Sequence, residues 1–468
     1  MTTQRSINPA TGETLAEHPA HSPEEVERRL ALAARAALRW RHTPVEERAA
    51  VVARLGELLD AEKERLGRLM TLEMGKPIQA AIDEAAKCAA GCRFYAEHGP
   101  AFVSDSVVED VGHRSFVSYE PLGVVLAIMP WNFPFWQVIR FASPALVAGN
   151  VGLLKHASNV PGCAIELESL IRRAGAPEGV FQSLLIGSDA VAGLLADPRI
   201  AAATLTGSEG AGRSVGKHAG EHLKKTVLEL GGSDAFVVMP SAELSRAIET
   251  AVKARTINNG QSCIAAKRFI VHEAIAERFL DGFSAGMQAL RVGDPLDPAT
   301  QLGPLASARL AEELETQVQD SVSKGARLVC GGRRTSPDGA FFQPTVLTDI
   351  PPESPAYRDE LFGPVGCVFV ARDLDDALRL ANDTRFGLGA SAWTNDAAEQ
   401  ERFVRGLEAG SVFVNDMVVS DPRFPFGGVK ASGYGRELSD VGLREFVNVK
   451  TVRVRVAAAG RETGQATE

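Results

Sequence analysis

The stretch LGVVLAIMPWNFPFWQVIR, from Leu122 to Arg140, joins an apolar segment to the start of a helix through a turn with two prolines. The apolar part is far shorter than the roughly 20 residues that a membrane-spanning helix needs, so it predicts a buried strand. Pro130 ends this strand, and Pro134 suits the first turn of a helix. Asn132 is therefore expected at the carboxyl end of a strand, where sheets of this kind bind ligands.

Similar apolar segments recur along the chain and alternate with segments of helix length. The first group comprises Val124–Ile128, Val151–Lys155, Val180–Ile186, Ala201–Gly207, Thr226–Leu230 and Ala235–Met239. A second group follows Cys263 and comprises Arg268–Val271, Ala326–Cys330, Gly366–Val370 and Gly410–Asn415. This alternation predicts parallel strands with crossover helices, and hence a doubly wound α/β domain followed by a second α/β region.

The two ends of the chain differ from this pattern. Ser22, followed by Pro23 and a glutamate, predicts a capped helix, and Thr43 with Pro44 predicts a second one of the same kind. An Ala-rich helix is expected around residues 77–98. Near the C-terminus, Val447–Val456 alternates apolar and polar residues like an exposed strand, which favours pairing with a partner subunit.

Composition excludes several classes of protein. A chain of 468 residues is expected to form two or three domains. Its formal net charge of −9 argues against a nucleic-acid or anionic-membrane surface, which needs clustered Lys and Arg. The N-terminus resembles neither a signal nor a transit peptide. Six cysteines without a CxxC cluster predict free thiols in a reducing cytoplasm, with no disulfide framework and no metal site.

Cys263, in NNGQSCIAAKRF (Asn258–Phe269), is the first candidate for chemistry. A cysteine usually packs as a small apolar group, but here Gly260 allows a tight turn just before the thiol. Backbone N–H groups on such a turn favour a thiolate and can bind an oxyanion. We therefore interpret Cys263 as a nucleophile.

Three further features suit the same reaction. Glu229, in LELGGSDA, ends an apolar strand, where burial would raise its pKa toward that of a general base. The amide of Asn132 can donate to an oxyanion. TLTGSEGAGR (Thr204–Arg213) predicts a helix N-terminus that can hold a phosphate. Together they fit attack of the thiol on an aldehyde, hydride transfer to a nicotinamide, and hydrolysis of the thioester by water that Glu229 activates.

A series of segments resembles the aldehyde dehydrogenase superfamily, in the right order from Ile7 to about Val452. The segments are INPATGE, PWNFP, TGSEGAG, LELGG, GQSC, DELFGPV, NDTRFGL and PFGGVKASGYGRE. The resemblance implies Cys263 as the nucleophile, Glu229 as the general base and Asn132 as the oxyanion donor. It also implies a Rossmann-type cofactor domain, an α/β catalytic domain and a small β oligomerisation element. These would comprise residues 1–102 with 122–231, residues 232–446, and residues 103–121 with 447–458, followed by a tail at 459–468.

The resemblance also implies the cofactor contacts. They are Trp131 and Asn132 near the nicotinamide, Lys155 and Ser158 near the adenosine ribose, Gly207 and Ser208 at the pyrophosphate, and Leu230, Glu360 and Phe362. Family members restricted to NAD often carry a glutamate at the position of Ser158, where it repels a 2′-phosphate. Here that repulsion is missing, so we expect either NAD or NADP to be used.

Arg140 suggests the substrate. Helix spacing places Trp136 and Arg140 on one face, just after Asn132, where an arginine could bind a carboxylate; the alternative is a surface arginine paired with an acidic neighbour. The matching residue of the succinate-semialdehyde dehydrogenase group is also an arginine that contacts the substrate carboxylate. The chain departs from that group at Ile257, where a second arginine is usual. Ser420 or Arg423, with Phe426 nearby, could supply the missing contact.

The expected function is therefore NAD(P)-dependent oxidation of succinate semialdehyde to succinate by a cytoplasmic homodimer or homotetramer. One alternative is a dehydrogenase of broad specificity, or one for another ω-carboxylated aldehyde such as glutarate semialdehyde. A cofactor-independent cysteine esterase is the alternative of a different class. It would need a histidine base, and none of the nine histidines lies in a comparable motif.

Overall fold

The computed structural model describes residues 3–336 and 339–456 and places the strand predicted from Leu122–Met129 inside a six-stranded sheet. The strand order is β17-β9-β8-β5-β6-β7, and all neighbours are parallel except β17 and β9. The bounds are β5 (Val124–Met129), β6 (Val151–His156), β7 (Phe181–Ser183), β8 (Ile200–Thr206), β9 (Lys225–Glu229) and β17 (Gly433–Tyr434). These parallel strands confirm the predicted α/β fold.

Helices from the N-terminal half surround this sheet, and α4 packs against both α2 and α5. Their bounds are α1 (Pro23–Trp40), α2 (Val45–Ala61), α3 (Lys63–Met74), α4 (Ile78–Phe102), α5 (Trp136–Ala148), α6 (Pro161–Arg173), η1 (Ser188–Ala190), α7 (Val191–Ala196) and α8 (Glu209–Glu221). Ser22 caps α1 as predicted. The predicted Thr43 cap is wrong, because α2 begins one residue later with Pro44 at its N-cap and no side-chain cap.

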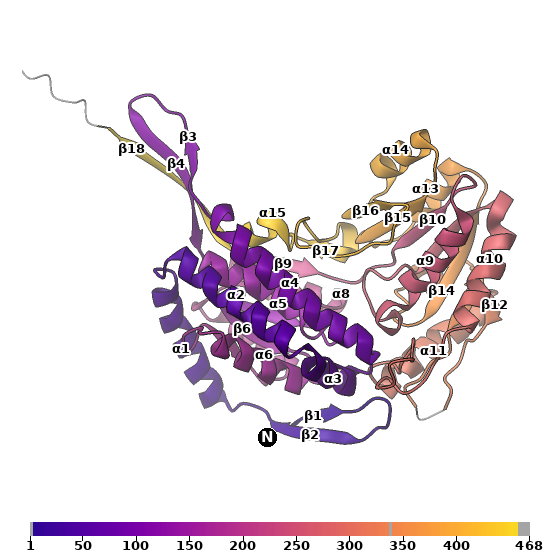
Figure 1. Cartoon of the computed structure of the whole chain (residues 1–468), viewed down its shortest axis with the longest axis horizontal. Helices are drawn as coiled ribbons and strands as arrows, with labels where there is room; N and C mark the ends of the chain where they lie inside the picture. The colour runs from indigo at the N-terminus through magenta and orange to yellow at the C-terminus, as the bar shows by residue number, and fades with distance from the viewer. Residues whose placement is uncertain (1–2, 337–338, 457–468) are drawn as a thin grey trace, which may run out of the picture.

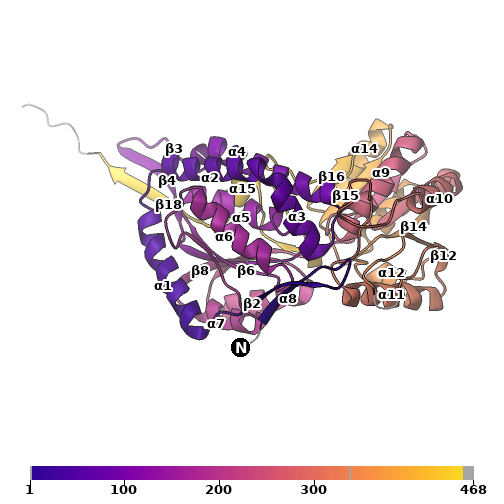
Figure 2. The same ribbon diagram turned by 60° about the horizontal axis from the view of Figure 1, so that its bottom comes forward.

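A seven-stranded sheet forms the second lobe, in the order β12-β13-β14-β11-β10-β15-β16. Figures 1 and 2 show it beside the first lobe, which consists of the six-stranded sheet and its helices. The strands are β10 (Ala235–Val238), β11 (Arg268–His272), β12 (Arg327–Cys330), β13 (Thr345–Thr348), β14 (Val365–Ala371), β15 (Gly389–Trp393) and β16 (Ser411–Val414). The helices are α9 (Leu244–Thr256), η2 (Ile257–Gly260), α10 (Glu273–Gln288), α11 (Ala308–Ser323), α12 (Pro355–Arg358), α13 (Leu374–Asn382) and α14 (Ala397–Gly406). The chain then returns to the six-stranded sheet, where η3 (Lys430–Ser432) precedes β17 and α15 (Ser439–Arg444) packs against α4 and α5.

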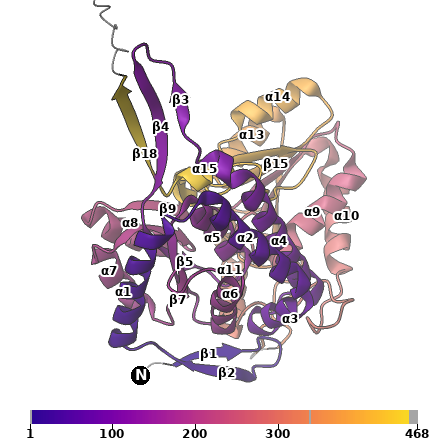
Figure 3. The same cartoon turned by 60° about the vertical axis from the view of Figure 1, so that its left-hand side comes forward.

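Three antiparallel strands form an arm that projects away from both lobes (Figures 1 and 3). They are β3 (Ser106–Val108), β4 (His113–Pro121) and β18 (Val447–Arg455), with β4 in the middle. The strand predicted at the C-terminus is thus confirmed, and the predicted tail at 459–468 lies outside the described residues. A separate hairpin, β1 (Thr3–Ile7) and β2 (Thr14–Pro19), was not predicted.

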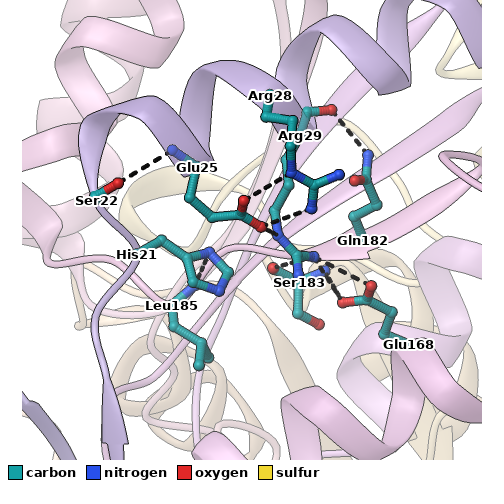
Figure 4. A network of polar contacts seen from close by, with 9 residues as sticks. All are labelled: His21, Ser22, Glu25, Arg28, Arg29, Glu168, Gln182, Ser183 and Leu185. Atoms are coloured by element: carbon teal, nitrogen blue, oxygen red, sulfur yellow. Dashed lines mark hydrogen bonds and ion pairs between the residues drawn. The ribbon is translucent and has the colours of Figure 1, made fainter.

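A polar network fixes α1 to the edge of the six-stranded sheet (Figure 4). The Arg29 guanidinium donates to both carboxylate oxygens of Glu168 at 3.1 Å and to the Ser183 carbonyl at 3.2 Å. In return, the Gln182 amide donates to the Arg29 carbonyl at 2.9 Å. Among the described residues, no helix is both long and apolar enough to cross a membrane.

Candidate active site

The turn that carries Cys263 joins α9 to β11, and its backbone is held in an unusual conformation. Asn258, Asn259 and Gly260 have φ angles of 55°, 59° and 75°. Asn tolerates this left-handed region better than most residues, and at Gly260 a Cβ atom would collide with the backbone of Gly363. The Asn259 amide donates to the carbonyls of Gly75 and Pro304, both at 2.9 Å. The turn is therefore fixed to elements of both lobes.

Lys267 forms hydrogen bonds to the backbone of the same turn. Its ammonium is fully buried and donates to the carbonyls of Ser262 and Cys263 at 2.9 Å and of Ala265 at 3.0 Å. It also pairs with the Glu360 carboxylate at 3.3 Å. One side chain thus connects the predicted nucleophile to a residue predicted to bind the cofactor.

Asn132 contacts the Cys263 turn directly. Its side-chain amide donates to the Gln261 carbonyl at 3.1 Å, and the Asn258 amide donates to the Asn132 carbonyl at 2.6 Å. An amide has two hydrogens, so one remains for another acceptor. The structure therefore brings Asn132 and the thiol-bearing turn together, as an oxyanion site requires.

Glu229 ends β9 and is fully enclosed. Its two carboxylate oxygens have no hydrogen-bond partner among the described residues. The segment after it runs against the cysteine turn, because a Cβ on Gly232 would lie 2.6 Å from the Cys263 carbonyl oxygen. Burial, and then the nearby Glu437 carboxyl, raises the pKa of Glu229 well above its usual range. A buried carboxyl with an elevated pKa suits a general base near neutral pH.

The charge state of Cys263 differs from the sequence expectation. The residue is partly exposed, yet burial of its sulfur raises the thiol pKa to about 12. The positive charges of Arg140 and Lys267 lower this pKa but do not overcome the burial. Burial thus opposes the predicted bias toward a thiolate, and the role of Cys263 as the nucleophile stays a prediction.

Arg140 has a partner that the sequence did not identify. It is buried on α5, where its guanidinium forms an ion pair with Glu437 and donates to the Thr206 hydroxyl at 3.2 Å. The Phe426 ring lies 4.7 Å away. We expected the Arg140 guanidinium to point into the aldehyde entrance. The structure instead shows it paired with Glu437, whose carboxylate balances its charge. A direct contact of Arg140 with substrate stays a prediction.

Ser420 and Arg423, the two residues considered for the missing contact, lie in different surroundings. The Ser420 hydroxyl is buried and accepts hydrogen bonds from the Lys87 ammonium at 2.7 Å and from the Trp136 indole at 3.1 Å. The Arg423 side chain is 69% exposed and pairs with Asp421 at 2.6 Å. Ser420 thus contacts both Lys87 and Trp136, whereas Arg423 faces solvent.

The predicted cofactor residues lie after the strands of the six-stranded sheet and around Glu360. Ser208 caps α8, and the Trp131 and Phe362 ring centroids are 5.8 Å apart. Glu360 and Phe362 also line a hollow of about 670 Å³. Leu230 packs against Gly212, where a Cβ would lie 2.6 Å from its side chain.

These residues fit a dinucleotide. Lys155 is half-buried and has no hydrogen-bond or ion-pair partner in the described part of the chain, so its charge is available to a ligand. Ser158 is exposed three residues further on, and Gly207 precedes the N-terminus of α8, which favours a phosphate.

Sequence reasoning missed three residues of the site: Lys87, Lys267 and Glu437. Lys267 follows Cys263 closely, so its charge beside the candidate nucleophile was a usable signal. Lys87 is a single lysine in an Ala-rich helix, and Glu437 lies far along the chain from Arg140. For these two, only the tertiary contacts reveal a role.

Comparison with known proteins identifies the family. The model of the aldehyde dehydrogenase family matches residues 1–452. Succinate-semialdehyde dehydrogenase [NADP(+)] 1 of Mycobacterium tuberculosis (strain ATCC 25618 / H37Rv) is 55% identical over 450 residues, which cover 96% of this chain and 98% of the relative. A probable succinate-semialdehyde dehydrogenase [NADP(+)] of Synechocystis sp. is 52% identical over 447 residues, which cover 96% and 98%.

Solved structures agree with this result. Succinic semialdehyde dehydrogenase from Streptococcus pyogenes, in complex with NADP+, is 34% identical with a TM-score of 0.94 over 97% of this chain and all of that one. The enzyme from Burkholderia pseudomallei is 36% identical, with the same TM-score over 97% and 95%. The chain belongs to the aldehyde dehydrogenase family.

Proposed function

We propose that this enzyme oxidises succinate semialdehyde to succinate with NADP as its preferred cofactor. The observation that carries the proposal is the 55% identity, over nearly the whole length of both chains, to a relative named for this substrate and cofactor. The exposed Ser158 supports the choice of NADP, because its hydroxyl leaves room for a 2′-phosphate that a carboxylate would repel. Lys155, whose charge has no partner among the described residues, lies on β6, the strand that leads to Ser158.

The same proposal assigns a role to each predicted catalytic residue. The Cys263 sulfur attacks the aldehyde carbon while the Asn132 amide stabilises the oxyanion. A nicotinamide held near Trp131 and Asn132 would supply the acceptor for the hydride of this carbon, so that its oxidation would leave a thioester. Glu229 then takes a proton from water, which attacks the thioester and releases the acid and the thiol. We assign cofactor binding to the domain of the six-stranded sheet and the nucleophile to the domain of the seven-stranded sheet.

A panel of aldehydes tests the substrate. Succinate semialdehyde, glutarate semialdehyde and butanal would each be assayed with NAD and with NADP by the absorbance of the reduced nicotinamide. The proposal expects the highest kcat/KM for succinate semialdehyde with NADP. A higher value for glutarate semialdehyde or butanal would overturn the substrate, and a higher value with NAD would overturn the cofactor. Ester hydrolysis without any nicotinamide reduction would point to the esterase instead.

We also propose that the arm mediates assembly into a homodimer or homotetramer. β18 forms one edge of its sheet, and Val449 and Val454 are exposed on it. Exposed strand edges of this kind pair readily with another chain. The cytoplasm is the proposed compartment, because all six cysteines are free thiols, the form kept in reducing surroundings.

A further inference from the structure

Lys87 lies beside the predicted substrate residues although no sequence motif includes it. It is part of α4, and its ammonium donates to the Ser420 hydroxyl at 2.7 Å. The same ammonium lies 4.5 Å from the centroid of the Trp136 ring. Because the Trp136 indole also donates to Ser420, the three side chains form one cluster, which we name the Lys87 cluster: Lys87, Trp136 and Ser420.

The cations around this cluster differ in how their charge is balanced. Arg140 pairs with Glu437, and Arg423 pairs with Asp421. Lys87 has no carboxylate within ion-pair distance among residues 3–336 and 339–456. Glu84, one helical turn before it, pairs with Lys76 instead. Within the described part of the chain, Lys87 is thus a cation of this region without a direct counter-ion.

A partly desolvated ammonium without a counter-ion is unfavourable unless an anion joins it. Burial, and then the positive charge of Arg140, lowers the pKa of Lys87 to about 8. A bound carboxylate would offset both effects. The side chain is only half-buried, so a ligand can reach it.

The hydrogen-bond geometry leaves donors free for such a ligand. The Lys87 ammonium has three hydrogens, and Ser420 accepts one of them. The Ser420 hydroxyl accepts from Lys87 and Trp136, so its own hydrogen is available to a further acceptor.

The cluster and the thiol share Arg140 as a charged neighbour. Trp136 and Arg140 are one turn apart on α5, and the charge of Arg140 acts on both Lys87 and Cys263. An aldehyde carbon at Cys263 and a cation at the far end of a short chain are therefore compatible with one bound molecule.

We propose that Lys87 determines substrate specificity by binding the terminal carboxylate of the semialdehyde, with the Ser420 hydroxyl as the second donor. The inference rests on the proposed function and extends it, because it assigns the recognition of the carboxylate to a lysine of α4. Arg140 then acts mainly through its charge and its pair with Glu437.

Lys87→Met tests this directly, since it removes the charge and retains an unbranched side chain of similar length. The readout is the ratio of kcat/KM for succinate semialdehyde to kcat/KM for butanal, which lacks the carboxylate. We expect this ratio to fall on the order of tenfold or more, mainly through a higher KM for the semialdehyde. Lys87→Arg should restore most of the ratio. An unchanged ratio in Lys87→Met would overturn the inference.

Two further variants keep the test decisive. Arg423→Gln is the matched control, because it removes a cation of the same region that is already paired, and it should change the ratio less than Lys87→Met does. If Lys87→Met does not fold, Lys87→Gln provides the same readout. A larger effect at Arg423 than at Lys87 would assign the carboxylate to the exposed arginine instead.

The outcome for the unmodified enzyme separates this inference from the proposed function. A wild-type ratio that favours butanal would remove the semialdehyde as substrate, whatever the variants do. A wild-type ratio that favours the semialdehyde, together with an unchanged ratio in the Lys87 variants, would refute only the role of Lys87.

Discussion

At the candidate site, burial removes water from ionisable side chains and shifts their pKa values. Burial raises the pKa of both Cys263 and Glu229, and both are therefore protonated more readily than in water. Arg140 and Lys267 act in the opposite direction on the thiol. Burial thus favours the protonated form of both groups, and the Cys263 thiol must lose its proton for the sulfur to attack as a thiolate.

The elevated pKa of Glu229 predicts how hydrolysis of the thioester depends on pH. The carboxyl acts as a base only when ionised, and a raised pKa moves ionisation toward higher pH. The hydrolysis rate should therefore rise with pH, over a range that lies above the one in which an ordinary glutamate ionises. Rapid-mixing measurements with a preformed acyl-enzyme follow this step. A rate independent of pH, or a normal rate in Glu229→Gln, would contradict the assignment.

The buried pair of Arg140 and Glu437 predicts a stability effect. Arg140→Met leaves the Glu437 carboxylate buried without its partner, and such changes typically cost about 3–5 kcal/mol. The free energy of unfolding, from urea titration, should fall by this order. Adding Glu437→Gln should recover part of the loss, because the second change removes the orphaned charge. A single variant as stable as the wild type would mean that the pair contributes little.

At the scale of elements, the turn between α9 and β11 carries the predicted nucleophile. Lys267 bonds three of its carbonyls and brings a positive charge to the thiol. Lys267→Met should therefore reduce kcat/KM by on the order of 10- to 100-fold through misplacement of the nucleophile. It should also shift the pH profile of Cys263 alkylation to higher pH, because the cation no longer lowers the thiol pKa.

Lys253→Met, at an exposed lysine on α9, is the control for this change. It should alter neither the alkylation profile nor kcat/KM. If Lys267→Met lowers activity and leaves the alkylation profile in place, Lys267 orders the turn but does not tune the thiol.

The elements also show where sequence reasoning succeeds. Buried strands such as β5 and β11 contain continuous apolar runs, and these two were predicted nearly to the residue. β13 is equally buried but was not predicted, and the strand predicted at Val180–Ile186 is only the three residues of β7. β15, with the sequence GASAW, was missed because its small residues carry little strand signal. The β1–β2 hairpin was missed because it is mostly polar. The cap at Thr43 failed because a threonine before Pro44 fits the pattern without forming the bond.

In the candidate site, residues in local motifs were predicted, whereas contacts between distant segments were not. Cys263, Glu229 and Asn132 lie in distinctive local motifs at turns or strand ends, so the sequence alone indicated them. The contacts of Lys87 with Ser420 and of Arg140 with Glu437 join segments that are hundreds of residues apart. No periodicity or local motif contains such a pair, because it arises only when the lobes fold.

For the whole molecule, the arm predicts a change in assembly. A chain that ends at Phe446 lacks β18 and leaves β4 unpaired on that side. It should have a smaller mass in solution than the full chain, as measured by light scattering on a sizing column. A chain that ends at Val456 retains β18 and serves as the control. Equal masses for all three chains would show that the arm does not hold the subunits together.

The most direct test of the account is the mass of the intact Glu229→Gln protein after mixing with succinate semialdehyde and NADP. We expect a gain of one succinyl group on Cys263, with one reduced nicotinamide formed per adduct, because oxidation proceeds and hydrolysis stalls. Cys263→Ala in the same background should gain nothing. Reduced nicotinamide without an adduct, or an adduct on another residue, would contradict the central claim that oxidation passes through the Cys263 sulfur.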